Sequence, residues 1–338
     1  MSKPVRSPAE EVAAPHGEAS AADASERRTR ADTLLRILRM ILLYAILRPI
    51  VMLPFAMQLA VGRTLGRLGH LLAHNQRRIV QCNLRACFPE LSPQEVARLE
   101  RRQFESLGMS GVEMTFAWWA SDKRLRERVD IVGLEHYRAA KARGETVLLL
   151  TAHFTTMEVC SIALSLAQPG MYGVYRAYDR NPVAEAVARE GRTRGGGTLI
   201  ERDDVMGMIR VLRSGNTLWM ASDQLVRPDK RSAIVKFFGL PCIAHGGVLD
   251  LARMTGARVM PLLPLRLPDG RYRLTIEPPF PDLPSGDRAG DLQRIMQRIE
   301  AHVRLDPAQY MWVWRRFGRL PPEYPDIYAL SVGSESEP

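Results

Sequence analysis

The stretch TVLLLTAHFTTMEVCSIALSLA, residues 146–167, decides the fold of this 338-residue chain. Its first six residues are a short apolar run with the length and composition of a buried strand, and residues 156–167 have the character of a helix. A short polar connection that contains His153 joins the two. The stretch therefore predicts a strand-to-helix unit of an α/β fold.

The same alternation continues on both sides of this unit, from about residue 131 to 325. Apolar strand-like runs occur at 172–175, 217–222, 234–238, 258–265 and 272–277, with helical segments at 134–143, 182–194, 204–214, 245–256 and 288–304. Asn181-Pro182 and Asp203-Asp204 are typical helix starts, while Gly144 and Gly215 are typical ends. We predict an α/β core with a mixed, mostly parallel sheet covered by helices.

The first 130 residues divide into three regions. Residues 1–30 have the composition of a disordered tail, 31–62 contain the apolar run MILLYAILRPIVMLPFAMQLAV, and 63–130 are mainly helical and basic. As one helix the run would be roughly 33 Å long, about the thickness of a bilayer core. Arg48, Pro49 and Pro54 disfavour a straight span, so a kinked span and an interfacial helix both fit, with a buried core helix as the alternative. We expect residues 31–62 to form a membrane anchor helix and 326–338 a C-terminal tail.

Within residues 63–130, Ser92-Pro93-Gln94-Glu95 has the pattern of a capping box that opens a helix. This helix is expected to reach about Leu107. A further amphipathic stretch ends in Trp118 and Trp119, which suit either a membrane interface or a core.

Composition limits the classes of partner. The formal net charge is +10, which favours an anionic partner such as lipid headgroups, nucleic acid or an acidic protein. No zinc-finger, basic-zipper or RNA-binding motif appears, so we expect no nucleic acid. The four cysteines have no metal-ligand spacing and are expected to be reduced thiols. The chain has no P-loop, GxGxxG, GxSxG or HExxH motif, and we expect neither cofactor nor metal.

His153 and Glu158 are the first candidates for catalysis. In one continuous helix they would point apart, so they can meet only if His153 lies in the loop and Glu158 in the first helical turn. The spacing Thr155-x-x-Glu158 predicts that start, through a capping box. A neutral imidazole can then take a proton from a hydroxyl while the carboxylate orients the ring. In the alternative interpretation, Glu158 only caps the helix and His153 is a buried structural residue.

Further polar residues follow other strands. Arg176 comes after the strand at 172–175, and Asp223 and Gln224 come after the strand at 217–222. Sites in open α/β sheets form at the carboxyl ends of strands, so these residues and His153 are expected to share one pocket. Arg192 lies near the end of a predicted helix, where a cation is also favourable for structural reasons.

These motifs, in order, resemble the late-step lipid A biosynthesis acyltransferases, within the lysophospholipid acyltransferase group. The resemblance covers about residues 35–325. It rests on the apolar N-terminal run, Asn83-Leu84-x-x-Cys87-Phe88-Pro89-Glu90, His153-x4-Glu158, Val174-Tyr175-Arg176, Asn181-Pro182, Gly191-Arg192, Asp223-Gln224, Phe237-Phe238-Gly239 and Gln309-Tyr310-x-Trp312-x-x-Arg315-Arg316-Phe317. The chain departs from the family pattern at Leu225, where a second acid is frequent, and at Trp314 and Gly318 in the last motif.

The resemblance implies an enzyme that moves a fatty acyl chain from acyl carrier protein to a hydroxyl of an anionic lipid A precursor. It implies an inner-membrane location with the catalytic domain on the cytoplasmic face. The His153–Glu158 dyad would be catalytic, and Arg192 and Asp223 would match further polar positions of the family. Another lipid acceptor (an ornithine lipid, a glycolipid or a lysophospholipid) stays open, as does a non-catalytic membrane-associated binding protein.

Overall fold

The computed structural model describes residues 44–45, 47–177, 181–224 and 227–329. The chain divides into two compact units, Met1–Ile46 and Leu47–Pro338, and the second contains all the elements named below. The first unit holds the expected tail at 1–30, which lies outside the described residues. In the second unit, the helical region and the α/β core form one body.

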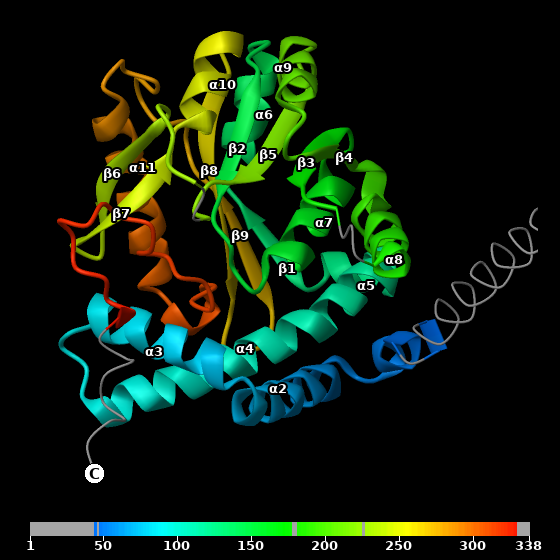
Figure 1. Ribbon diagram of the computed structural model, residues 1–338. Helices are drawn as coiled ribbons and strands as arrows, with labels where there is room; N and C mark the ends of the chain where they lie inside the picture. The colour runs from blue at the N-terminus through cyan, green and yellow to red at the C-terminus, as the bar shows by residue number, and fades with distance from the viewer. Residues whose placement is uncertain (1–43, 46, 178–180, 225–226, 330–338) are drawn as a thin grey trace, which may run out of the picture. The chain divides into compact units, whose positions relative to one another are not determined.

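The described residues form a seven-stranded sheet in the order β1-β9-β8-β2-β5-β3-β4 (Figure 1). All neighbours are parallel except β8 and β9. The strands are β1 (Val129–Val132), β2 (Val147–Thr151), β3 (Met171–Tyr175), β4 (Thr198–Glu201), β5 (Thr217–Ala221), β8 (Arg258–Arg266) and β9 (Tyr272–Ile276). The predicted α/β class with a mixed, mostly parallel sheet is confirmed.

Helices alternate with the strands as predicted: α5 (Asp122–Arg126) comes before β1, and each of the others comes after a strand. The others are α6 (Leu134–Ala142), α7 (Met157–Ala167), α8 (Pro182–Arg192), α9 (Val205–Arg213), α10 (Gly247–Thr255) and α11 (Arg288–Val303), with short 3-10 turns η1 (Arg194–Gly196) and η2 (Pro307–Gln309). Every residue of β2 is buried, because helices cover both faces of a parallel sheet. The alternation of polar and apolar residues that marks a half-exposed strand is therefore absent there.

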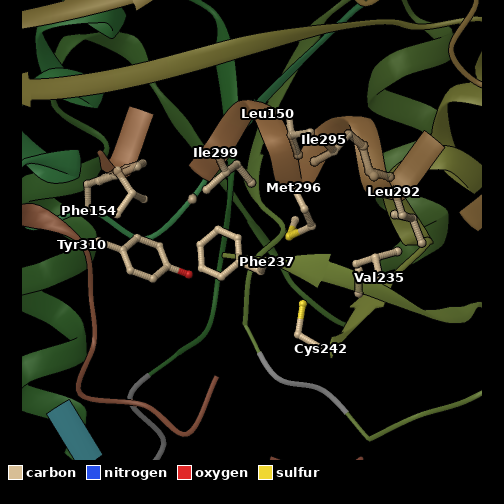
Figure 2. Close-up of a cluster of buried hydrophobic side chains, with 14 of the residues drawn as sticks. Leu150, Phe154, Val235, Phe237, Cys242, Leu292, Ile295, Met296, Ile299 and Tyr310 are labelled. Carbon is tan, nitrogen blue, oxygen red and sulfur yellow. The ribbon is translucent and has the colours of Figure 1, made fainter. Parts of the chain in front are cut away.

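A separate antiparallel hairpin, β6 (Ser232–Phe237) and β7 (Leu240–His245), packs against α11. Figure 2 shows the core between them, in which Phe237 and Met296 lie near Phe154 of the β2–α7 loop and Tyr310 of the C-terminal segment. This core joins the hairpin to the loop that carries His153. The packed side chains of this core therefore hold the β2–α7 connection in place.

Three longer helices come before α5 and the sheet: α2 (Phe55–Leu72), α3 (His74–Cys87) and α4 (Pro93–Trp119). Ser92 and Glu95 form the predicted capping box at the start of α4. The helix continues well past Leu107 to Trp119, so the two expected segments are one. Figure 1 shows α2 beside α4. Their backbones come close because Gly62 and Gly66 face α4; a Cβ at Gly66 would lie 2.2 Å from the Phe104 carbonyl oxygen.

Among the described residues, no helix is both long and apolar enough to cross a membrane. Much of the anchor expected at 31–62 lies outside the described residues, namely 31–43 and Ile46. The described part does not continue as one helix, since the helical residues stop at Met52 and α2 begins again at Phe55 with Pro54 at its N-cap. Proline removes a donor and fixes the backbone, which explains the break.

Candidate active site

His153 lies in the connection between β2 and α7, at the carboxyl end of β2, as the sequence predicted. The C-terminal segment holds this connection through a short antiparallel bridge between Phe154 and Tyr310. The Thr155 amide donates to the Gln309 carbonyl at 2.9 Å, and the Met311 amide donates to the His153 carbonyl at 3.1 Å. Two segments distant in sequence thereby fix the backbone of the candidate catalytic residue.

The carboxylate bound to the His153 ring belongs to Asp223. Its Oδ1 lies 2.6 Å from His153 Nδ1, and both of its oxygens accept from the His153 amide, at 3.1 and 3.0 Å. The register of the sheet explains this contact, because Thr151 of β2 is paired with Ala221 of β5. Residues two positions beyond each strand end consequently lie side by side.

Asp223 is almost fully buried, with 1% of its side chain exposed. Burial opposes its ionisation, but the charge and hydrogen bonds of His153, with a contribution from Arg316, outweigh burial and hold the pKa of the Asp223 carboxyl below its usual value. An ionised carboxylate can only accept at Nδ1. The proton of neutral His153 is therefore assigned to Nδ1, which leaves Nε2 free to accept a proton.

Two further buried groups lie behind Asp223. Arg316 is buried and donates through Nη1 to the Ile243 carbonyl at 3.0 Å. Burial raises the pKa of the Tyr310 hydroxyl, and the nearby Asp223 charge raises it further, so this phenol stays protonated. The sequence placed both residues in the last family motif but gave them no role. In the structure they surround the carboxylate that orients His153.

Glu158 lies in the first turn of α7 and binds other partners. Its Oε1 accepts from Trp118 Nε1 at 2.9 Å and from Arg192 Nε at 3.0 Å, and its Oε2 accepts from Arg192 Nη2 at 3.2 Å. The expected capping box is wrong, because Thr156 is the N-cap residue and no side chain caps the helix. The His153 imidazole is hydrogen-bonded to Asp223 and not, as expected, to Glu158. Arg192, which the sequence placed near the end of a helix, pairs with Glu158.

Two cavities meet at His153. The first, called here the basic cavity, has a volume of about 1060 Å³, and the second, called the α7 cavity, has about 880 Å³. Both are lined by His153, Arg176 and Gln224, which the sequence predicted to share a pocket. Glu158 and Arg192 line only the α7 cavity, and Asp223 lies behind His153, outside both.

The linings of the two cavities differ in chemistry. Eight basic side chains line the basic cavity: Arg176, Arg202, Arg227, Lys230, Arg231, Arg253, Arg288 and Arg319. Its two acidic residues, Asp203 and Asp250, each pair with one of these arginines. The α7 cavity is lined mainly by apolar and small side chains, including Met114, Met157, Ile162, Met171, Leu199 and Trp219. An imidazole between an anion-binding space and an apolar space suits a reaction between a charged molecule and a lipid chain.

Trp314 is a site residue to which the sequence gave no role. Its ring stands edge-on to the His153 imidazole with 4.9 Å between centroids, and it lines the α7 cavity. The sequence marked this position only as a departure from the family pattern. This edge-on contact limits rotation of the imidazole.

Comparison with known proteins adds to this geometry. The family model described as bacterial lipid A biosynthesis acyltransferase matches residues 28–319. The chain belongs to this family. A lipid A biosynthesis lauroyltransferase of Escherichia coli (strain K12) is 34% identical over 82% of this chain and 91% of that protein. A lipid A biosynthesis acyltransferase of Haemophilus influenzae (strain ATCC 51907 / DSM 11121 / KW20 / Rd) is 32% identical, over 84% of this chain and 92% of that protein.

A lipid A biosynthesis palmitoleoyltransferase of Escherichia coli (strain K12) is 30% identical, over 82% of this chain and 90% of that protein. Membership of the bacterial lipid A biosynthesis acyltransferase family supports acyl transfer to lipid A as the activity. The predicted family is thus confirmed.

Proposed function

We propose that this acyltransferase moves a fatty acyl chain from an acyl carrier protein thioester to a hydroxyl of a lipid A precursor. The proposal rests on the His153 imidazole, which is hydrogen-bonded to buried Asp223. Its second nitrogen can accept a proton, and the residue lines both the basic cavity and the α7 cavity. The acceptor would occupy the basic cavity, where its phosphates meet arginines. The acyl chain would occupy the α7 cavity.

In the proposed reaction, His153 Nε2 takes the proton of the acceptor hydroxyl as its oxygen attacks the thioester carbonyl. Asp223 keeps the other ring proton on Nδ1 and stabilises the imidazolium that forms. The carbon–sulfur bond then breaks, and the imidazolium returns the proton to the departing thiolate. A thioester is already activated, so the reaction needs no nucleotide.

Glu158 and Arg192 are proposed to act as a charge pair on the wall of the α7 cavity, close to the reacting carbonyl. Their pairing, with the indole of Trp118 on the same carboxylate, fixes the first turn of α7 relative to α8 and α4. Arg176 and Gln224 line both cavities and are proposed to bind polar groups of the substrates where the two cavities join. Asp223, in place of Glu158, is the proposed partner of the imidazole.

The inner membrane is the proposed location, with the α/β domain on the cytoplasmic face, where acyl carrier protein is available. One face of α2 supports it: Met57, Leu65, Leu68, Leu71 and Leu72 are all at least half exposed and fall on one side of the helix. Arg63 and Arg67 lie beside this apolar face. Such a face suits the interface of an anionic membrane.

The proposal is tested by incubating the purified protein with acyl carrier protein thioesters and three acceptors, namely a lipid A precursor, a lysophospholipid and an ornithine lipid precursor. Mass spectrometry is expected to find acyl transfer to the lipid A precursor and a loss of about 10²–10⁴-fold in His153→Ala. Transfer to only one of the other acceptors would move the assignment to that lipid. Binding without transfer to any acceptor would favour a non-catalytic protein.

A further inference from the structure

A buried network of polar side chains connects α4 and β8 to the β2–α7 connection. Glu113 of α4 binds Arg266 of β8 through both carboxylate oxygens. Arg266 Nη1 donates to Ser106 Oγ at 3.0 Å, and Ser106 Oγ lies 2.8 Å from Thr155 Oγ1. All four side chains are buried. The network therefore runs from an ion pair in the interior to a hydroxyl of the connection that carries His153.

The charge of Arg266 sets the direction of the first hydrogen bond in this network. Burial opposes that charge, but the charge of Glu113 and its hydrogen bonds outweigh burial and hold the pKa of the Arg266 guanidinium above its usual value. A guanidinium has donors and no acceptor. The Ser106 oxygen is consequently the acceptor in its contact with Arg266.

The hydroxyls of Ser106 and Thr155 together have one proton more than they have acceptors. Each hydroxyl carries one proton, and within the described part of the chain the only acceptor for either proton is the oxygen of the other hydroxyl. The cation bound to Ser106 polarises its O–H bond and makes it the better donor. Ser106 therefore donates to Thr155, and the proton left without an acceptor belongs to Thr155.

The position of Thr155 shows what could accept this proton. Thr155 lines the α7 cavity together with His153 and Glu158, whereas Ser106 lines neither cavity. Helix α7 begins two residues after Thr155, and no side chain caps its positive N-terminus. The charge of Glu158 on the same wall is paired with Arg192. These surroundings favour an oxygen that gains negative charge beside the imidazole.

We propose that Thr155 is a further catalytic residue, whose hydroxyl donates to the carbonyl oxygen of the acyl thioester and stabilises the negative charge that develops there. This inference rests on the proposed function. As the acceptor oxygen bonds to the carbonyl carbon, the π electron pair moves onto the carbonyl oxygen, which accepts from Thr155. The pair returns when the carbon–sulfur bond breaks, and Thr155 keeps its proton. Ser106 and Arg266 are positioning residues that orient this hydroxyl.

The first test removes the donor and keeps the shape of the side chain. Thr155→Val should lower kcat for acyl transfer by about 10²-fold and change KM by less than about threefold, because the contact strengthens in the transition state. Thr155→Ser keeps the hydroxyl and should retain kcat within about fivefold of wild type. Ser106→Ala leaves the Thr155 hydroxyl unoriented and should lower kcat by about tenfold.

Thr156→Val is the matched control, with thermal melts as the check of folding in every variant. The Thr156 hydroxyl is also buried, has no hydrogen-bond partner among the described residues, and lines neither cavity. Its kcat should stay within about twofold of wild type. A folded Thr155→Val protein with kcat in that range would overturn the inference. Equal losses in Thr155→Val and Thr155→Ser would overturn it as well.

A second readout requires no transfer. An acyl carrier protein thioester with an isotope label at the carbonyl carbon is bound in the absence of acceptor, and infrared difference spectroscopy gives its carbonyl stretching frequency. A hydrogen bond from Thr155 lowers this frequency, so wild type and Thr156→Val should agree and Thr155→Val should move it towards that of the free thioester. The same frequency in wild type and Thr155→Val would overturn the inference. A lowered frequency in wild type without transfer to any acceptor would defeat the proposed function and leave the Thr155 contact in place.

Discussion

At the scale of single residues, the site depends on where one proton lies. The buried, ionised Asp223 accepts from both His153 Nδ1 and the His153 amide, so the neutral ring has its proton on Nδ1. The Arg316 charge favours the ionised carboxylate, the neighbouring Tyr310 phenol stays protonated, and the Trp314 ring packs edge-on against the imidazole. The basic nitrogen is thus presented at the junction of the two cavities before any substrate binds.

Glu158 and Arg192 lead to a prediction about pairing. Both side chains are mostly buried, and the guanidinium contacts both carboxylate oxygens. Glu158→Gln and Arg192→Gln should each lower the free energy of unfolding, and the double variant should lose about 1 kcal/mol less than the sum of the two. Urea unfolding of the four proteins measures this coupling. Strict additivity would show that the two residues act independently.

At the scale of secondary-structure elements, the crossing of α2 and α4 depends on glycine. Gly62 and Gly66 of α2 meet the backbone of α4 at Phe104 and at the turn around Gly108. A side chain at either position would force the helices apart. The sequence gave no indication of this contact, because the apolar run at 40–61, which extends into α2, suggested a membrane segment.

Gly66→Ala should destabilise the fold by about 1–3 kcal/mol. Its Cβ would lie 2.2 Å from the Phe104 carbonyl oxygen, so the backbones of α2 and α4 would have to move apart. Gly69→Ala is the control on the same helix, where a Cβ meets nothing within 4 Å. It should be neutral or stabilising by up to about 1 kcal/mol, because alanine favours helix. Thermal or urea unfolding gives both values. Equal effects of the two variants would contradict the packing described.

The elements themselves were largely predictable from sequence. The runs at 146–151, 217–222, 258–265 and 272–277 all form strands, and the caps at Ser92, Asn181 and Asp204 are present. The strands β1, β4 and β7 were missed, and β1 and β4 are only four residues long. The fold class could therefore be predicted from the pattern of apolar runs, whereas the shortest strands could not be detected from it.

The partner of His153 could not be deduced from sequence because it depends on which strands are neighbours. Glu158 is five residues away in sequence, whereas Asp223 is 70 residues away and becomes adjacent only because β5 lies beside β2. The sequence did place Asp223 at a strand end near the pocket. The order of strands, which has no local signal, decided between the two carboxylates.

At the scale of the whole molecule, the surface combines an overall basic charge with an apolar face on α2. The formal charge is +10. Positive charge on the protein favours approach to anionic lipids and to an acidic carrier protein, and the apolar face adds a term that salt does not screen. The proposed membrane location requires both contributions.

Leu65→Glu/Leu68→Glu should reduce binding to vesicles of phosphatidylglycerol and phosphatidylcholine by about tenfold or more, because two apolar side chains become charged at the proposed interface. Met206→Glu/Ile234→Glu changes two exposed apolar residues elsewhere by the same charge and should bind within about twofold of wild type. Vesicle co-sedimentation at low and high salt measures the effect. Similar losses in both double variants would point to charge alone rather than the face of α2.

Asp223 holds the His153 proton on Nδ1, and the Asp223→Asn variant reverses this arrangement. The His153 amide would keep the asparagine oxygen, so its NH2 group would face Nδ1 and force the ring proton onto Nε2. The fold should persist, while kcat for acyl transfer from an acyl carrier protein thioester to the lipid A precursor should fall by about 10²–10⁴-fold. A folded Asp223→Asn protein with kcat within about twofold of wild type would contradict the account.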